Sequence, residues 1–157
     1  MSRILAGNKA ERWEKFFILS AGCILLVTGL AKVISASGKA AILENTDPLF
    51  GISFRHLMLL AGITELVVSG ACFLRAKRNH SLNLVTWLAT AFLVYRAGLW
   101  YIGWRRPCPC MGYVTDALHI HSQTADTIMK IILAYLLFGG YGTLLLFSVR
   151  NMKRSLT

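Results

Sequence analysis

The sequence predicts an all-α membrane protein, a bundle of four transmembrane helices that forms one domain over residues 1–157. Hydrophobic residues make up 55% of the chain and charged residues 15%, with a mean hydropathy of +0.56. An average soluble domain is about 25% charged. Four apolar segments, near 16–36, 54–74, 84–104 and 128–149, each have about the 20 residues that carry an α-helix across a ~30 Å hydrocarbon layer. Helices are expected because a membrane span must pair its backbone groups internally.

The first predicted helix, 16–36, follows a polar and basic segment, and Trp13 and Phe16 are typical of residues that anchor a helix at a membrane surface. Its apolar run is longer than the roughly 7–15 residues of a signal peptide, so we expect a retained helix. Cys23 in this run and Cys72 in the second are expected to be small buried hydrophobic residues.

The second helix, 54–74, follows Ser53, a residue suited to capping a helix. A short basic connection, 75–81, leads to the third helix at 84–104. Turn residues in the first connection include Asp47, and the connection between the third and fourth helices, 105–127, is the longest.

The fourth helix is expected to start at Ser122 or Thr124, ahead of its apolar run at 128–149. Asp126 suits the positive end of this helix, and Lys130, four residues on, is its expected partner.

The basic residues predict an orientation. The N-terminal segment, the connection 75–81 and the tail carry ten Lys and Arg residues. The opposite side carries four: Lys39 in the first connection, Arg55 at the start of the second helix, and Arg105 and Arg106 in the connection 105–127. Cytoplasmic loops are enriched in Lys and Arg, so both termini are expected in the cytoplasm and the 105–127 segment outside it. The net charge is +10, but the Lys and Arg residues cluster between apolar runs rather than on one polar face. We therefore expect the lipid bilayer, and not nucleic acid, as a partner.

Lys32, Glu65 and Arg96 lie in or near three different apolar segments. A single charge at the bilayer centre costs at least ~2.5 kcal/mol, so mutual pairing is expected. A rise of about 1.5 Å per residue brings Glu65 and Arg96 to similar depths, about 14 and 18 Å from the cytoplasmic side. The sequence therefore predicts a Glu65–Arg96 pair, while Lys32, about 24 Å up, could extend to the outer rim. The pair either fixes helix register or forms a polar pocket for a quinone head group or a proton relay.

The most reactive stretch is the cysteine pair Cys108 and Cys110, separated only by Pro109. Their Cα atoms can approach to the roughly 4.4–6.8 Å that a disulfide requires, and a strained bond of this kind favours thiol–disulfide exchange. Arg105 and Arg106 would support a thiolate on Cys108. The pair could instead be an inert structural disulfide. A third alternative is metal handling, with His119 and His121 as weak additional ligands, although the spacing follows no familiar zinc pattern.

The chain resembles the DoxX-like superfamily of four-helix membrane proteins, specifically its MauE type. Gly29-Leu30-Ala31-Lys32 is similar to the G-x-x-K of their first helix, and Glu65 to the acidic residue of their second. The run 107–112, Pro-Cys-Pro-Cys-Met-Gly, resembles the P-C-G-C-F-G run after their third helix. Pro109 and Met111 depart from that pattern.

The resemblance implies a redox-associated protein of the bacterial inner membrane that serves thioredoxin-like or exported partners, with Cys108 and Cys110 in exchange. A thiol–disulfide oxidoreductase is thus the expected activity. By analogy with vitamin K epoxide reductase, a quinone near Arg96 and Glu65 is the candidate electron acceptor. The alternative is a non-catalytic scaffold or accessory subunit held among other membrane subunits.

Overall fold

The computed structural model describes residues 2–38, 41–74, 78–104 and 122–155, and these residues are helical apart from short connections. The helices are α1 (Ser2–Ser37), the short 3₁₀ helix η1 (Ala41–Glu44), α2 (Phe54–Phe73), α3 (Arg78–Tyr101) and α5 (Ser122–Ser155). No strand occurs in these ranges, where Thr46 and Ser53 form only an isolated antiparallel bridge.

Each long helix contains a segment long and apolar enough to cross a membrane. The segments are Arg12–Ser37, Phe54–Phe73, His80–Tyr101 and Gln123–Leu146. The prediction of four spanning helices is confirmed in these terms, and the chain is a multi-pass membrane protein by length and composition. α1 and α5 extend beyond their predicted spans at both ends, most of all α1 at its N-terminus. α3 begins and ends earlier than predicted, and α2 ends at Phe73 rather than at residue 74.

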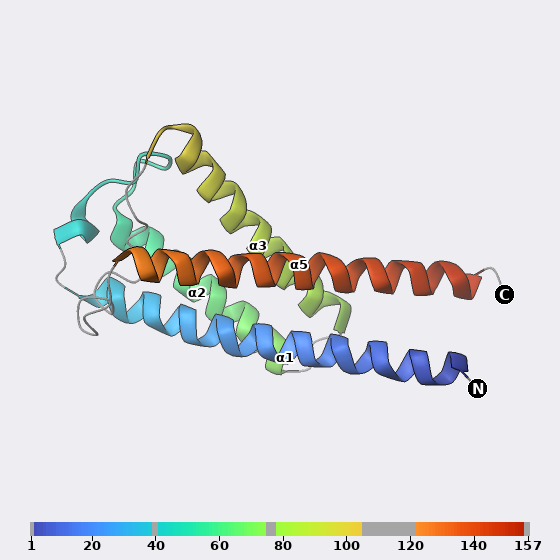
Figure 1. Cartoon of the computed structure of the whole chain (residues 1–157). Coiled ribbons are helices and arrows are strands. Elements are labelled where there is room, and N and C mark those ends of the chain that lie inside the picture. The colour runs from blue at the N-terminus through green and yellow to red at the C-terminus, as the bar shows by residue number, and fades with distance from the viewer. Residues whose placement is uncertain (1, 39–40, 75–77, 105–121, 156–157) are drawn as a thin grey trace.

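The helices form an up-and-down bundle. Figure 1 shows α1 and α5 running alongside each other with both chain termini at one end, here named the terminal end. The opposite end, here named the loop end, is where α1 and α3 finish and where α2 and α5 begin. The closest helix pair is α1 with α2, followed by α3 with α5.

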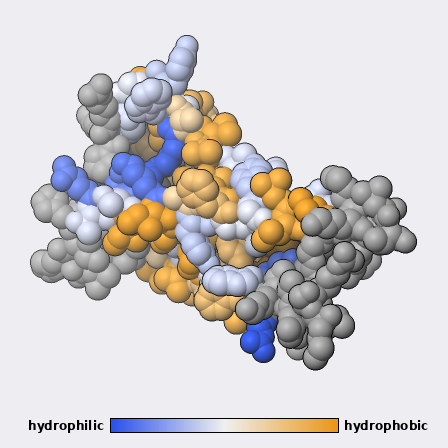
Figure 2. Space-filling model, turned by 45° about the vertical axis from the view of Figure 1, so that its right-hand side comes forward, coloured by the Kyte–Doolittle hydropathy of each residue, from blue (hydrophilic) through white to orange (hydrophobic). Residues whose placement is uncertain are grey.

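The core occupies the half of the bundle nearer the terminal end. It joins buried side chains of all four long helices: Phe17, Ala21, Leu25, Val68, Cys72, Leu82, Val85, Leu88, Ala89 and Leu136. A smaller cluster at the loop end joins Ala36, Leu43 and Met58 and fixes η1 against α1 and α2. Outside these clusters many large apolar side chains are exposed, including Trp100 and Phe138, and Figure 2 shows hydrophobic residues over much of one face. A soluble monomer rarely exposes so much apolar surface, whereas a lipid-facing one must.

Two local predictions have mixed outcomes. Ser53 immediately precedes α2 as predicted, but its hydroxyl hydrogen-bonds His56 Nδ1 at 2.6 Å and caps no backbone N–H. Cys72 is buried as predicted, whereas Cys23 is exposed, because it lies on the face of α1 turned away from the other helices. The expectation that Cys23 is buried was therefore wrong.

Candidate functional site

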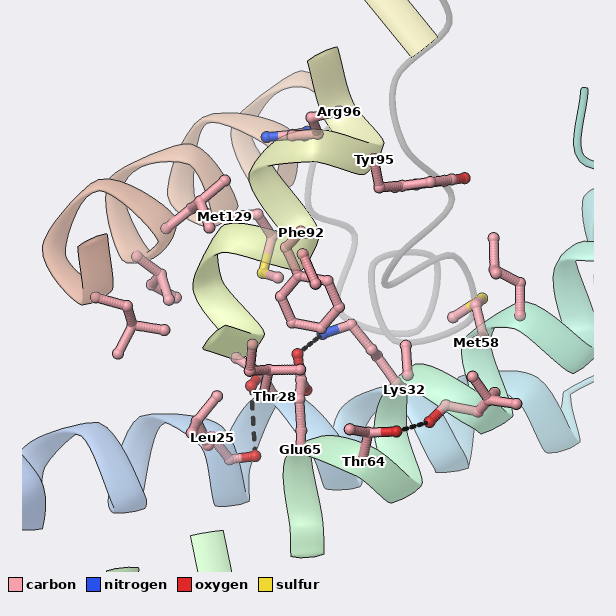
Figure 3. A pocket seen from close by; sticks show the side chains of 18 of the residues that line it. Leu25, Thr28, Lys32, Met58, Thr64, Glu65, Phe92, Tyr95, Arg96 and Met129 are labelled. Atoms are coloured by element: carbon pink, nitrogen blue, oxygen red, sulfur yellow. Dashed lines mark hydrogen bonds and ion pairs between the residues drawn. The ribbon is translucent and has the colours of Figure 1, made fainter. Parts of the chain in front are cut away.

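A buried ion pair joins the first two helices. Lys32 Nζ on α1 donates a hydrogen bond to Glu65 Oε1 on α2, and both side chains are almost entirely buried, at 6% and 2% exposed. Figure 3 shows the two side chains reaching toward each other from neighbouring helices. The pairing gives each buried charge a counter-charge, and either charge alone in the apolar interior would be costly.

The direction of the side chains explains this pairing. Side chains on an α-helix tilt toward its N-terminus. Lys32 on α1 therefore points from the loop end toward the bundle centre, and Glu65 on the antiparallel α2 points from the centre toward the loop end. The two side chains therefore point toward each other along the bundle axis, so their charged ends meet although their backbone positions differ in depth.

The predicted Glu65–Arg96 pair is consequently wrong, as is the expectation that Lys32 extends to the outer rim. The prediction compared only the depths of the backbone positions. In the structure α1 packs most closely against α2, so Glu65 meets Lys32 rather than Arg96. Arg96 lies on α3 beyond Phe92, away from Glu65 (Figure 3).

Arg96 instead pairs with Asp126 near the start of α5. Asp126 also contacts Lys130 Nζ at 2.8 Å, which confirms the expected i,i+4 pair. This group is more accessible than the Lys32–Glu65 pair, with the Lys130 side chain 63% exposed. Asp126 lies near the start of α5 and Arg96 near the end of α3, so the two residues come close because α3 ends and α5 begins at the loop end.

One oxygen of Glu65 has no hydrogen-bond partner. Oε2 is buried without one, whereas Oε1 accepts from Lys32. The Thr28 hydroxyl lies near the Glu65 carboxylate and donates to the backbone oxygen of Ile24 at 3.0 Å. The ammonium group of Lys32 also lies 5.4 Å from the ring centroid of Phe92, within the range of a cation–π contact.

These groups line a cavity of about 280 Å³ in the half of the bundle nearer the loop end. Its wall is apolar apart from Lys32, Glu65, Arg96 and a few hydroxyl groups, and all four long helices contribute to it (Figure 3). The wall comprises Leu25, Thr28, Lys32, Phe50, Phe54, Leu57, Met58, Leu60, Ala61, Thr64, Glu65, Trp87, Leu88, Ala91, Phe92, Tyr95, Arg96, Met129, Ile132, Leu133 and Leu136. Glu65 and Arg96 thus border one pocket although they do not pair with each other.

The connection before α2 folds over the loop end of this cavity. The Asp47 carboxylate accepts hydrogen bonds from the backbone N–H groups of Leu49 and Phe50 through Oδ1, each at 2.9 Å. Its Oδ2 accepts from the Tyr95 hydroxyl at 2.6 Å, and the Phe50 and Tyr95 rings stack 5.9 Å apart. Sequence reasoning treated Asp47 as a turn residue only and missed its role in fixing this connection to α3.

The remaining predicted site residues lie outside the part of the chain that the structure describes: Arg105, Arg106, Cys108, Cys110, His119 and His121. Within the described residues, Cys23 and Cys72 are free thiols, and no three His, Cys, Asp or Glu side chains gather in a way that could hold a metal ion.

Comparisons with family models, with curated proteins and with solved structures give no significant match to this chain. The site must therefore be interpreted from its own chemistry.

Proposed function

We propose that this protein is a thiol–disulfide redox protein of the bacterial inner membrane, related to the MauE type of the DoxX-like superfamily. Its reactive group is the pair Cys108 and Cys110, and its substrates are thiols of thioredoxin-like or exported proteins. The observation that carries the proposal is the Cys-Pro-Cys spacing immediately after a membrane-spanning helix.

The bundle supports this assignment. The cysteine segment joins α3 to α5, and the end of α3 and the start of α5 both lie at the loop end (Figure 1). Cys108 follows Trp104 by four residues, and about 3.3–3.6 Å per residue limits the separation of their Cα atoms to about 14 Å. The basic residues of the termini and of 75–81 favour a cytoplasmic terminal end, and thus an oxidising compartment for the cysteines.

The exchange proceeds in two balanced steps. A thiolate of the partner attacks one sulfur of the Cys108–Cys110 disulfide, and the other sulfur leaves as a thiolate. A second partner thiolate then attacks the partner sulfur of this mixed disulfide, which forms the partner's disulfide and releases the remaining bridge cysteine as a thiolate. The partner is oxidised to a disulfide, and Cys108 and Cys110, reduced, take up the two protons. A membrane quinone that accepts two electrons and two protons to become a quinol is the class of oxidant that restores the pair.

The test uses single Cys108→Ser and Cys110→Ser variants in a background where Cys23 and Cys72 are serine. We expect one of the two single variants to trap a mixed disulfide with an exported protein. That same protein should accumulate in its reduced form, as measured by alkylation and gel mobility in intact cells.

The double Cys108→Ser/Cys110→Ser variant is the matched control and should give no adduct. If neither single variant traps an adduct and the redox state of exported proteins is unchanged, the cysteine pair has no exchange role and the scaffold alternative replaces this proposal.

A further inference from the structure

We infer that the cavity at the loop end binds a neutral, lipid-soluble molecule that carries a hydroxyl group, a long-chain phenol or alcohol, with the hydroxyl donating a hydrogen bond to Glu65 Oε2. The inference uses none of the cysteines and is independent of the exchange proposed above.

The cavity contains a buried acceptor without a hydrogen-bond donor. Glu65 is 2% exposed and lines the cavity, yet its Oε2 has no hydrogen-bond partner. Leaving a buried polar atom unpaired costs about 1–3 kcal/mol, more for a charged group. A ligand that supplies a donor at this point would remove that cost.

The charges around Glu65 Oε2 favour a neutral donor. Lys32 already neutralises the charge of Glu65, so a cationic ligand would add an unpaired charge to an apolar cavity. A neutral hydroxyl satisfies Oε2 and can also accept a hydrogen bond from the Lys32 ammonium group. The ring of an oxidised quinone carries acceptors without a donor, so it would leave Oε2 unpaired, whereas the dihydroxy form would not.

The cavity is accessible from the lipid side of the bundle. Leu60 on α2 and Trp87 and Ala91 on α3 line the cavity and are also exposed, with Leu60 66% and Trp87 64% exposed. All three lie within membrane-spanning segments. The cavity therefore reaches the lipid-facing surface between α2 and α3, two helices that contact each other much less than α1 contacts α2. An apolar molecule dissolved in the bilayer can enter there without crossing water.

The lining of the cavity suits an apolar ligand. Apolar side chains, most of them aromatic or branched aliphatic, form most of the wall, which is typical of sites for ring compounds or hydrocarbon chains, with a few polar groups to fix orientation. At about 280 Å³, the cavity holds a ring head group and the first part of a chain, and the rest would extend into lipid.

The experiment uses the full chain in lipid nanodiscs and a dodecylphenol that carries a photoreactive diazirine in its chain. We expect light-dependent labelling of residues at the α2–α3 opening. Unlabelled 4-dodecylphenol should compete at about tenfold lower concentration than its methyl ether, 4-dodecylanisole, because the ether lacks the donor for Glu65. Labelling spread over the lipid-facing surface, or equal competition by phenol and ether, would overturn the inference.

Two variants sharpen the test. Ala91→Leu places three more carbon atoms at the opening without touching the ion pair, and it should abolish competed labelling. Ala97→Leu is the control, an exposed alanine of the same helix that does not line the cavity, and it should leave labelling unchanged. In Glu65→Gln the amide oxygen should stay with the Lys32 ammonium group, which leaves an N–H donor in the place of Oε2. The phenol and its methyl ether should then compete at nearly equal concentrations. Should the glutamine variant fail to fold, the alanine pair still decides, and equal labelling of the two alanine variants contradicts the inference.

Discussion

The partner of each buried charge is set by the direction of its side chain. Lys32 and Glu65 meet because their helices run in opposite directions and both side chains tilt toward the N-terminus of their own helix. The same reasoning applies to Arg96, whose helix α3 runs toward the loop end while α5, with Asp126 near its start, returns from it.

Removing one member of the buried pair should be strongly destabilising. Lys32→Met leaves Glu65 buried without a counter-charge, and we expect the free energy of unfolding to fall by about 3–5 kcal/mol. The double variant Lys32→Met/Glu65→Met should recover most of this loss, because apolar groups of similar volume replace a buried pair at little cost. Unfolding by a denaturing detergent in mixed micelles measures both values.

Lys130→Met is the matched control for that measurement. It removes an exposed ammonium group from Asp126, which keeps its bond to Arg96, and the change should stay below about 1 kcal/mol. A Lys32→Met variant no less stable than Lys130→Met would show that the buried pair does not stabilise the bundle.

Between elements, small residues determine how closely α1 and α2 approach. A Cβ atom built on Gly62 would lie 3.0 Å from the Gly29 backbone oxygen, and one on Gly29 would lie 3.0 Å from the Gly62 backbone oxygen. The Ser69 hydroxyl adds a hydrogen bond of 2.8 Å to the Gly22 backbone oxygen across the same contact. Small residues and interhelical hydrogen bonds matter here because lipid provides no hydrophobic drive for helix association.

The prediction for this contact is that Gly62→Leu forces the two helices apart and lowers the free energy of unfolding by about 1–3 kcal/mol, the usual cost of overpacking. Gly70→Leu on the same helix is the control, since a Cβ atom there has no other atom within 4 Å. The same detergent titration compares them, and equal losses for both variants would contradict a close glycine contact.

A second contact between elements fixes the connection before α2. Tyr95→Phe removes the donor to Asp47 Oδ2, which is fully buried, and should cost about 1–3 kcal/mol. The Leu49 and Phe50 amides, which donate to the same carboxylate, should exchange their hydrogens faster. Tyr101→Phe, on an exposed tyrosine of the same helix, should leave their exchange unchanged. Equal exchange in the two variants would show that the connection is fixed by other contacts.

In the whole molecule, the two halves of the bundle differ. The half nearer the terminal end is packed by side chains from every long helix, whereas the half nearer the loop end encloses a cavity with an ion pair at its polar part. A cavity in a packed interior lowers the stability of the fold. A bundle with a purely structural role would gain stability from filling it, so the cavity favours a binding role for the half nearer the loop end.

The number of spanning helices and their approximate positions could be predicted from the sequence, because the length and apolarity of each run are local properties and the bilayer thickness sets the length that a span needs. The sequence also identified Lys32, Glu65 and Arg96 as residues that must find partners. Their partners became clear from the three-dimensional arrangement alone, since pairing depends on which helices are neighbours and on the tilt of each side chain. The cavity, the unpaired oxygen of Glu65 and the Asp47–Tyr95 bond likewise depend on residues far apart in the chain, and no local pattern contains them.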